Sequence, residues 1–329
     1  MKMALQTTKD KSREHASFLL QKLFARLWNC GLLQDFGSGP FPEKNFIKQL
    51  KIKSLVCMPR WLQAYHNDLR YVLEKEEHLS VNFQTVDGLQ LDGMLFHHNR
   101  PKVVLFIPGL GSFYESIATQ GSIMQRFYEF FSLALPSCAL FVFNNRGIGN
   151  SQGAFDLKNL PLDTYSAYLF LTTKQRYRPE DIFIYTHSLG GLHGIQGAQL
   201  FQKKYPTATL CAISDRSLGS LSRFTKAFLN HTPFANLAAS MISKLGLNLS
   251  AKQAWLDLKG EKMIIVSKQD RIIPYDQGSF YHFMQSDIPR DSVLHLEEEC
   301  FVENHHTRLF TEKETKHIVD FIHRSLSLN

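Results

Sequence analysis

Residues 181–192 read DIFIYTHSLGGL, and this stretch decides the fold class. The apolar run DIFIY has the length and composition of a buried strand, and it leads directly into the small and polar residues THSLGG. A helical pattern then continues to about Lys204. A strand, a tight turn and a helix in this order form one unit of a sheet covered by helices. Ser188 lies in the turn itself, at the predicted carboxyl end of the strand.

The same unit recurs along the chain. Continuous apolar runs of this kind suit parallel strands that are buried on both faces. Such runs occupy residues 102–107, 138–143, 208–213 and 262–266, and a short one occupies 292–296. A hairpin precedes them, with strands at 79–86 and 89–97 joined at Asp87-Gly88. Helices are expected near residues 116–133, 162–175, 189–204, 275–285 and 312–325.

The turn at Ser188 resembles the nucleophile elbow of α/β-hydrolases. That elbow requires small residues two positions to either side of the serine, because the strand and helix backbones nearly touch. Gly190 satisfies one side, whereas Thr186 stands where the family pattern G-x-S-x-G has its first glycine. The resemblance covers about residues 79–326. It implies the α/β-hydrolase fold, with a mostly parallel central sheet and helices on both faces, and it implies that Ser188 is the nucleophile.

The resemblance also points to an acid after a late strand. Residues 262–274, KMIIVSKQDRIIP, are similar to the family segment that carries the catalytic aspartate, and Asp270 takes its place. The alternative is Asp215, at the end of the preceding strand, where some lipases place the acid. The acid accepts the second N–H of the catalytic histidine and stabilises its charged form.

The histidine is expected in the loop after the last strand. Residues 303–308 read ENHHTR and are similar to the family segment with the general base, which places His306 at the catalytic position. His305 is the alternative, one residue away. The order serine, aspartate, histidine, each near the carboxyl end of a predicted strand, suits a crevice at that edge of an open sheet.

Two backbone amides are expected to hold the oxyanion. The amide of Leu189 lies at the start of the helix that follows the nucleophile, where the partial positive charge favours an anion. Residues 108–112, PGLGS, are similar to the family's H-G-x-G loop with a proline in place of the histidine. By position the second donor is Leu110, with Gly109 as the alternative.

A narrower resemblance rests on three motifs taken together. PGLGSFYES, FNNRGIGNSQG and YTHSLGG look most like those of the bacterial CHLPS/SidB-type hydrolases of intracellular pathogens. This implies a bacterial hydrolase that acts on lipids or is delivered into a host cell as an effector. In the second motif, Arg146 is expected to brace the loops below the active site without a catalytic role.

Two segments fall outside the repeat of strands and helices. Residues 1–78 form a predicted helical N-terminal extension, ahead of a hydrolase domain at 79–329. Around Phe18–Trp28 its apolar residues share one side of a helix and basic residues share the other, so it either packs on the domain or makes a peripheral membrane contact. Residues 216–258 separate two strands and are placed to form a lid or cap.

Composition narrows the functional class. The 329 residues carry a net charge of +7, without the motifs or dense basic stripe of a nucleic-acid-binding protein, so no nucleic-acid partner is expected. Five dispersed cysteines favour reduced thiols. No histidine spacing suggests a metal, and no cofactor is expected. With neither a Sec signal nor a long apolar span, a soluble cytoplasmic protein is expected, or one exported by another route.

These features predict a serine hydrolase that cleaves a carboxylic ester, including a lipid ester, or a thioester through an acyl-enzyme. A peptidase, amidase or acyltransferase uses the same residues. A hydrolase-like protein that binds a membrane or partner without catalysis is the alternative from another class, motivated by the departures at Thr186 and Pro108. The sequence does not indicate the oligomeric state.

Overall fold

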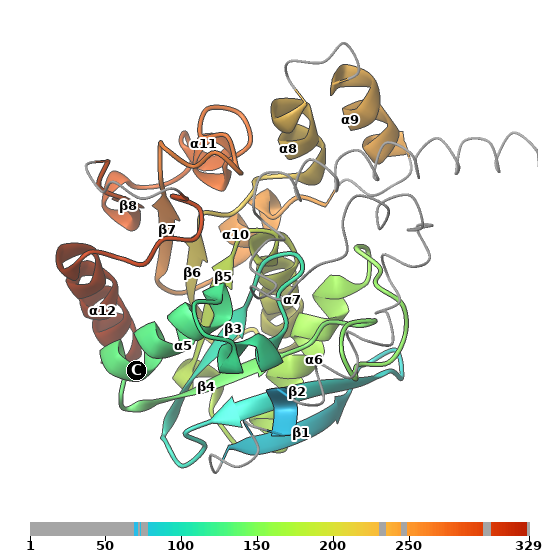
Figure 1. The fold of residues 1–329 in the computed structure, drawn as a ribbon, viewed down its shortest axis with the longest axis vertical. Coiled ribbons are helices and arrows are strands. Elements are labelled where there is room, and N and C mark those ends of the chain that lie inside the picture. The colour runs from blue at the N-terminus through green and yellow to red at the C-terminus, as the bar shows by residue number, and fades with distance from the viewer. Residues whose placement is uncertain are drawn as a thin grey trace, which may run out of the picture.

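The computed structural model describes residues 69–71, 73, 78–229, 235–244, 249–298 and 304–327. Eight strands of this part of the chain form one sheet in the order β1-β2-β4-β3-β5-β6-β7-β8 (Figure 1). The pairs β1–β2 and β2–β4 are antiparallel, and all other neighbouring pairs are parallel. The strands are β1 (Leu79–Gln84), β2 (Gln90–Phe96), β3 (Lys102–Ile107), β4 (Cys138–Phe143), β5 (Ile182–His187), β6 (Cys211–Asp215), β7 (Lys262–Val266) and β8 (Val293–His295).

Helices cover both faces of this sheet. One face packs against α5 (Ile123–Ala134) and α12 (Glu312–Ser327). The other packs against α6 (Leu160–Thr173), α7 (Gly190–Lys204) and α10 (Lys252–Asp257). The remaining elements are η1 (Tyr114–Ala118), η2 (Pro179–Asp181), α8 (Leu221–Phe228), α9 (Ala235–Lys244), α11 (Phe280–Met284) and η3 (Arg290–Ser292).

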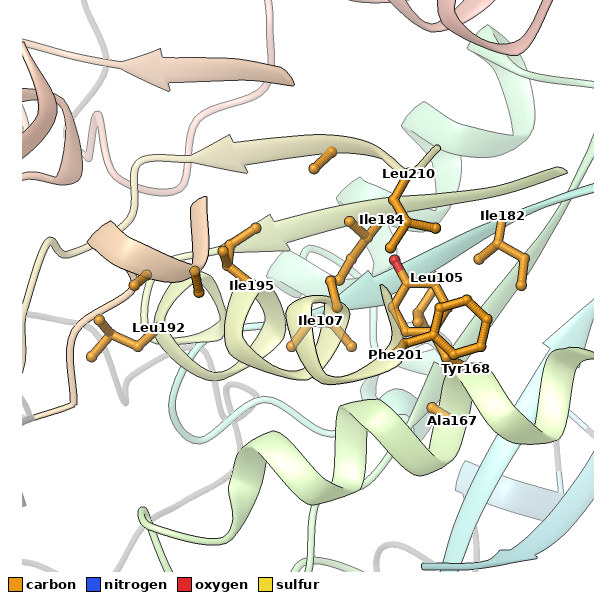
Figure 2. Packing of buried hydrophobic residues seen from close by; sticks show 14 of the residues in the cluster. Leu105, Ile107, Ala167, Tyr168, Ile182, Ile184, Leu192, Ile195, Phe201 and Leu210 are labelled. Atoms are coloured by element: carbon orange, nitrogen blue, oxygen red, sulfur yellow. The ribbon is translucent and has the colours of Figure 1, made fainter. Parts of the chain in front are cut away.

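The central strands bury side chains on both faces because successive residues point to opposite sides. Leu105 and Ile184 face α7, as Figure 2 shows, whereas Phe106 and Tyr185 face α5. All four side chains are buried. This two-sided burial explains why the strands appear in the sequence as unbroken apolar runs, without the alternation of a half-exposed strand.

The α/β-hydrolase fold expected from the sequence is therefore present in the sheet order and the two helical layers. The predicted strands at 102–107, 138–143 and 262–266 coincide with β3, β4 and β7. The predicted helix 116–133 is instead divided into η1 and α5. The chain adopts a positive φ at Gly121, and the Ser122 side chain then accepts the amide of Gln125 as the N-cap of α5.

The predicted helix 275–285 is wrong over its first half, because α11 begins only at Phe280. The amides of Gly278 and Ser279 both donate to the carbonyl of Pro274, which closes a turn there. The Ser279 side chain then caps α11 by accepting the amide of His282 at 3.2 Å.

A bridge between Leu218 and Ser279 joins the predicted cap segment, 216–258, to the rest of the domain near its start. A second bridge, between Ser220 and Ser250, lies within the segment. Between Ser220 and Ser250, α8 and α9 pack on each other and lie apart from the sheet at the top of Figure 1. The last part of the segment, α10, packs on α7 and belongs to the layer over the sheet. A cap role for α8 and α9 remains a prediction.

The predicted amphipathic helix at Phe18–Trp28 lies outside the described residues, as does most of the extension at 1–78. No helix in the described ranges has both the length and the apolar character needed to cross a bilayer.

Arg70, in the described part of the extension, contacts a buried carboxylate. Arg70 donates to Asp92 at 2.6 Å, and the hydroxyl of Tyr114 donates to the other carboxylate oxygen at 2.9 Å. Burial raises the pKa of Asp92 to about 6, with Arg70 opposing the shift and Glu115 adding to it. Tyr114 begins η1, two residues after the PGLGS loop, so this network anchors the chain directly after the loop.

The pKa of Asp92 in the folded protein lies above the value near 4 of an aspartate in an unfolded chain. As the pH falls, Asp92 therefore binds a proton in the folded protein at a higher pH than in the unfolded chain. Wild type should therefore gain stability relative to Asp92→Asn, which has no such proton to bind. We expect the free energy of unfolding of wild type, relative to that of Asp92→Asn, to rise by about 1 kcal/mol when the pH is lowered from 7 to 5. Urea denaturation of both proteins at the two pH values measures it. A shift in the opposite direction would contradict the pKa of Asp92.

Candidate active site

The chain reverses direction at Ser188, between β5 and α7. Ser188 has φ 57°, in the left-handed region that residues with a Cβ rarely adopt. A Cβ at Gly190 would lie 2.2 Å from the carbonyl oxygen of Ile107 and 2.6 Å from that of Pro108. Only glycine therefore allows α7 to begin this close to β3. The turn leaves the Ser188 side chain at the carboxyl edge of the sheet, 6% exposed.

Thr186, the departure from the family pattern, is accommodated by a second glycine. Its hydroxyl donates to the carbonyl of Ile213 at 3.0 Å, which satisfies the buried polar atom. Its methyl group faces α7 at Gly194, where an added Cβ would lie 2.7 Å from the Thr186 Cγ2 atom. The space that the first glycine of the pattern usually provides on the strand is provided here on the helix.

This pairing predicts an energetic coupling between Thr186 and Gly194. Gly194→Ala alone should lower the free energy of unfolding by about 1–3 kcal/mol, because the new methyl group overlaps that of Thr186. In the Thr186→Ser background, which keeps the hydroxyl and removes the methyl, the same change should be neutral or stabilising, since alanine favours a helix over glycine by about 1 kcal/mol. Denaturation of the four proteins of the double-mutant cycle measures the coupling.

Gly197→Ala is the matched control on the same helix. Its Cβ would lie 2.5 Å from the Cβ of Thr164 instead, so Thr186→Ser should not rescue it. Equal effects of Gly194→Ala in both backgrounds would contradict the accommodation of Thr186 by Gly194.

The structure brings Ser188, His306 and Asp270 into one hydrogen-bonded line. The Ser188 Oγ and His306 Nε2 atoms lie 3.0 Å apart, and His306 Nδ1 lies 2.7 Å from Asp270 Oδ2. Because a carboxylate only accepts, Nδ1 carries the proton and Nε2 is left to accept the serine hydroxyl. The other oxygen of Asp270 accepts the amides of Ile272 and Ile273 at 2.8 and 2.9 Å, which fixes the carboxylate. His306 is fully buried.

The alternatives Asp215 and His305 make other contacts. Both oxygens of Asp215 bind the guanidinium of Arg216 at 2.7 Å, and one of them also accepts the hydroxyl of Tyr185 at 3.0 Å. The side chain of Asp215 is thereby occupied in a buried ion pair. His305 contributes its backbone carbonyl to Arg216 at 3.0 Å. Neither residue has a hydrogen bond to the Ser188 hydroxyl.

The amides expected to hold an oxyanion lie around Ser188. Leu189 is the N-cap residue of α7, and its amide donates to no other described residue. The PGLGS loop packs directly on the serine, since a Cβ at Gly109 would be 2.9 Å from the Ser188 Cβ and 3.3 Å from Oγ. The amides of Gly109 and Leu110 likewise donate to no described residue. These three N–H groups, in the residue after Ser188 and in the loop packed on it, thus have no acceptor among the described residues.

His187 and Arg216 adjoin this line of residues, and no motif in the sequence assigned either of them a role in the site. Burial lowers the pKa of His187 well below its ordinary value, with the nearby His306 and Arg216 adding to the shift, so its ring is neutral. Burial alone would lower the pKa of Arg216, but the Asp215 carboxylate holds it above the ordinary value, so the guanidinium stays charged. The Asp-Arg dipeptide at the end of an apolar strand was the available sequence signal for Arg216.

Arg146, the predicted brace, has no hydrogen bond to Ser188, His306 or Asp270 and binds two other aspartates. It binds Asp163 through Nε and Nη2, at 2.8 and 2.6 Å, and Asp87 through Nη1 at 2.8 Å. It therefore joins the start of α6 to the turn between β1 and β2. Among the residues that the structure describes, no group of three or more His, Cys, Asp or Glu side chains could hold a metal ion.

Solved structures with similar folds include several esterases. No family model and no curated protein sequence matches the chain. An esterase of Pyrococcus furiosus matches 76% of this chain and 92% of its own, with 17% identity and a TM-score of 0.55. An alpha-beta hydrolase of Vibrio vulnificus matches 79% and 84%, with 18% identity and a TM-score of 0.55. This chain has the α/β-hydrolase fold. Acetyl xylan esterase 1 of a Thermoanaerobacterium species is similar over 76% of this chain and 82% of its own, with 12% identity and a TM-score of 0.50.

The geometry predicts unequal effects of the two adjacent histidines. His306→Gln should reduce kcat for an ester substrate by at least about 10³-fold, because no base remains to accept the serine proton. His305→Gln should leave kcat within about threefold of wild type, since the hydrogen bond that Arg216 donates to the backbone carbonyl of residue 305 is kept in this variant. Steady-state kinetics of wild type and both variants measures kcat, and equal thermal midpoints of the three proteins show that the variants are folded. A larger loss from His305→Gln than from His306→Gln would rule out His306 as the base.

Proposed function

We propose that this protein is a serine hydrolase that cleaves a carboxylic ester or thioester through an acyl-enzyme intermediate. The observation that carries the proposal is the 3.0 Å contact between Ser188 and a histidine whose other nitrogen is held by Asp270 at 2.7 Å. A nucleophile, a base and a group that orients the base are the minimum set for this chemistry. The esterases among the structurally similar proteins give the same class of reaction.

In the acylation step, Ser188 Oγ attacks the carbonyl carbon of the substrate while its proton moves to His306 Nε2. The imidazolium that forms is stabilised by Asp270, which keeps its negative charge. The negative charge on the carbonyl oxygen is stabilised by the amide of Leu189 together with an amide of the Gly109–Leu110 loop. Collapse of the tetrahedral intermediate breaks the bond to the alcohol or thiol, which leaves with the proton from His306.

Deacylation uses the same groups in reverse. A water molecule gives a proton to His306 Nε2 as its oxygen attacks the acyl carbon, and the oxyanion again lies against the same amides. The intermediate then releases the carboxylic acid, and Ser188 recovers its proton from His306. No cofactor is needed in either half of the reaction.

Lipid esters are our preferred substrates within this class. The support is that α8 follows the carboxyl end of β6 along the chain, with α9 packed against it, where a cap would cover an acyl chain, and that Leu237 on α9 is exposed. The resemblance to CHLPS/SidB-type hydrolases favours the same substrates. A role without catalysis is not favoured, because both departures from the family pattern leave the line from Ser188 to Asp270 intact.

A fluorophosphonate probe and a panel of p-nitrophenyl esters with acyl chains of 2 to 16 carbons test the proposal. Wild type should be labelled and should hydrolyse at least one ester, whereas Ser188→Ala should lose both activities. Ser112→Ala is the control, because this serine lies in the loop beside the site and has no contact with His306. Folded wild-type protein that is neither labelled nor active on any ester or thioester would refute the proposal.

A further inference from the structure

His306 lies on a turn and not on a helix or strand, so its own segment does not fix its position. The described part of this loop runs from Asn304 to Thr311, where α12 follows. Its internal hydrogen bonds are few: the Asn304 side chain accepts the amide of His306 at 3.0 Å, and the Asn304 carbonyl accepts the amide of Thr307 at 3.3 Å. A third runs from Arg308 Nη1 to the carbonyl of Leu309 at 2.7 Å. A catalytic base must nevertheless be held to within about 0.5 Å. The constraint has to come from outside the loop.

Arg216 supplies two contacts from the end of β6. Its Nη1 donates to the carbonyl of His305 at 3.0 Å and to that of Arg308 at 2.8 Å. Its Nε and Nη2 donate to the two oxygens of Asp215, so the guanidinium itself cannot rotate. The backbone of Arg216 has φ 43° and is held by a bond from its amide to the carbonyl of Ile265 at 2.8 Å. The side chain is fully buried.

His187 supplies a third contact from the end of β5. Its Nε2 lies 3.0 Å from the carbonyl oxygen of His306, and because a carbonyl only accepts, Nε2 must carry the proton. The two imidazole rings lie 4.8 Å apart between centroids. His187 immediately precedes Ser188, so the backbone of the base is joined directly to the residue beside the nucleophile.

We propose that Arg216 and His187 are positioning residues, which hold the His306 loop by its backbone so that the imidazole lies between Ser188 and Asp270. Side chains at the ends of the two strands donate hydrogen bonds to three of the four successive carbonyls from 305 to 308. Fixing the carbonyls of 305 and 306 fixes the peptide planes on both sides of the His306 Cα, and therefore the direction of its side chain. This inference rests on the proposed function and extends it to two residues outside the catalytic line.

The chemistry of each side chain suits this task. Arg216 must bind a carboxylate with two N–H groups while a third group reaches two carbonyls, which requires the planar fork of arginine and exceeds what a lysine can do. His187 is neutral because it is buried, so it holds the carbonyl without placing a second positive charge beside the imidazolium of His306.

Paired variants at His187 separate the hydrogen bond from packing. His187→Phe fills the buried site without a donor, and His187→Gln keeps an N–H donor at similar reach. We expect His187→Phe to reduce kcat about 10–100-fold with KM within twofold of wild type, the size of loss that a small displacement of a catalytic group causes. His187→Gln should recover most of kcat. The rate of fluorophosphonate labelling at Ser188 should fall and recover in the same way.

Arg216→Lys is the corresponding variant on β6, and Arg146→Lys is its matched control. Both arginines are buried and bind aspartates, but Arg146 has no contact with the His306 loop. Both variants should lower the thermal midpoint, whereas only Arg216→Lys should reduce kcat, again about 10–100-fold. The low-field proton resonance of the His306 Nδ1–H group, bound to Asp270, reports the same displacement without substrate. It should be lost or shifted in Arg216→Lys and His187→Phe and unchanged in Arg146→Lys.

The two levels of the proposal fail differently. Wild type that is not labelled and hydrolyses nothing would overturn the proposed function, while the resonance of His306 would still report whether the loop is held. Active wild type whose kcat and resonance are unchanged in folded His187→Phe and Arg216→Lys would overturn the positioning role alone. Equal losses in His187→Phe and His187→Gln would also overturn it, because packing and not the N–H donor would then be responsible.

Discussion

The reversal of the chain at Ser188 is the constraint on which the rest of the structure depends. A residue with a Cβ is held at φ 57°, and α7 starts so close to β3 that Gly190 has no room for a side chain. This one turn places the serine hydroxyl at the edge of the sheet and the amide of Leu189 beside it. The proposed nucleophile and one proposed oxyanion donor therefore cannot shift independently. The PGLGS loop packs on the same serine at Gly109 and further restricts its movement.

Features whose determinants are local could be predicted from the sequence. The strands at β3, β4 and β7 were found to the residue because a strand buried on both faces leaves a continuous apolar run. The turn at Ser188 was found because its glycines and its flanking strand and helix lie within about a dozen residues. The helix predicted to begin at Tyr275 begins later, at Phe280. Residues 275–279 have a helical composition, but a turn closed on the carbonyl of Pro274 and the N-cap at Ser279 prevent the helix from starting there.

The family segments placed Asp270 and His306 ahead of Asp215 and His305, but the physical difference within each pair lies in three-dimensional contacts. Asp215 ends β6 and Asp270 lies in the loop that follows β7, while His305 and His306 share a polar loop. What separates the two aspartates is Arg216, whose left-handed backbone turns its guanidinium back onto Asp215 and occupies it. What separates the histidines is the capture of the His305 and His306 carbonyls by residues about 90 to 120 positions earlier in the chain. No local pattern encodes such pairings.

The same contacts determine the charge around the base. Asp215 is neutralised by Arg216, and His187 is uncharged because it is buried, so neither contributes a net charge next to His306. Asp270 bonds to backbone amides and to His306 and has no ion pair with an arginine or lysine among the described residues. In the proposed mechanism, its negative charge is available to the imidazolium that forms when Ser188 loses its proton. A buried arginine placed one residue from the rival aspartate thus gives the two carboxylates different roles in that mechanism, because Asp215 is bound permanently and Asp270 gains its partner cation only during the reaction.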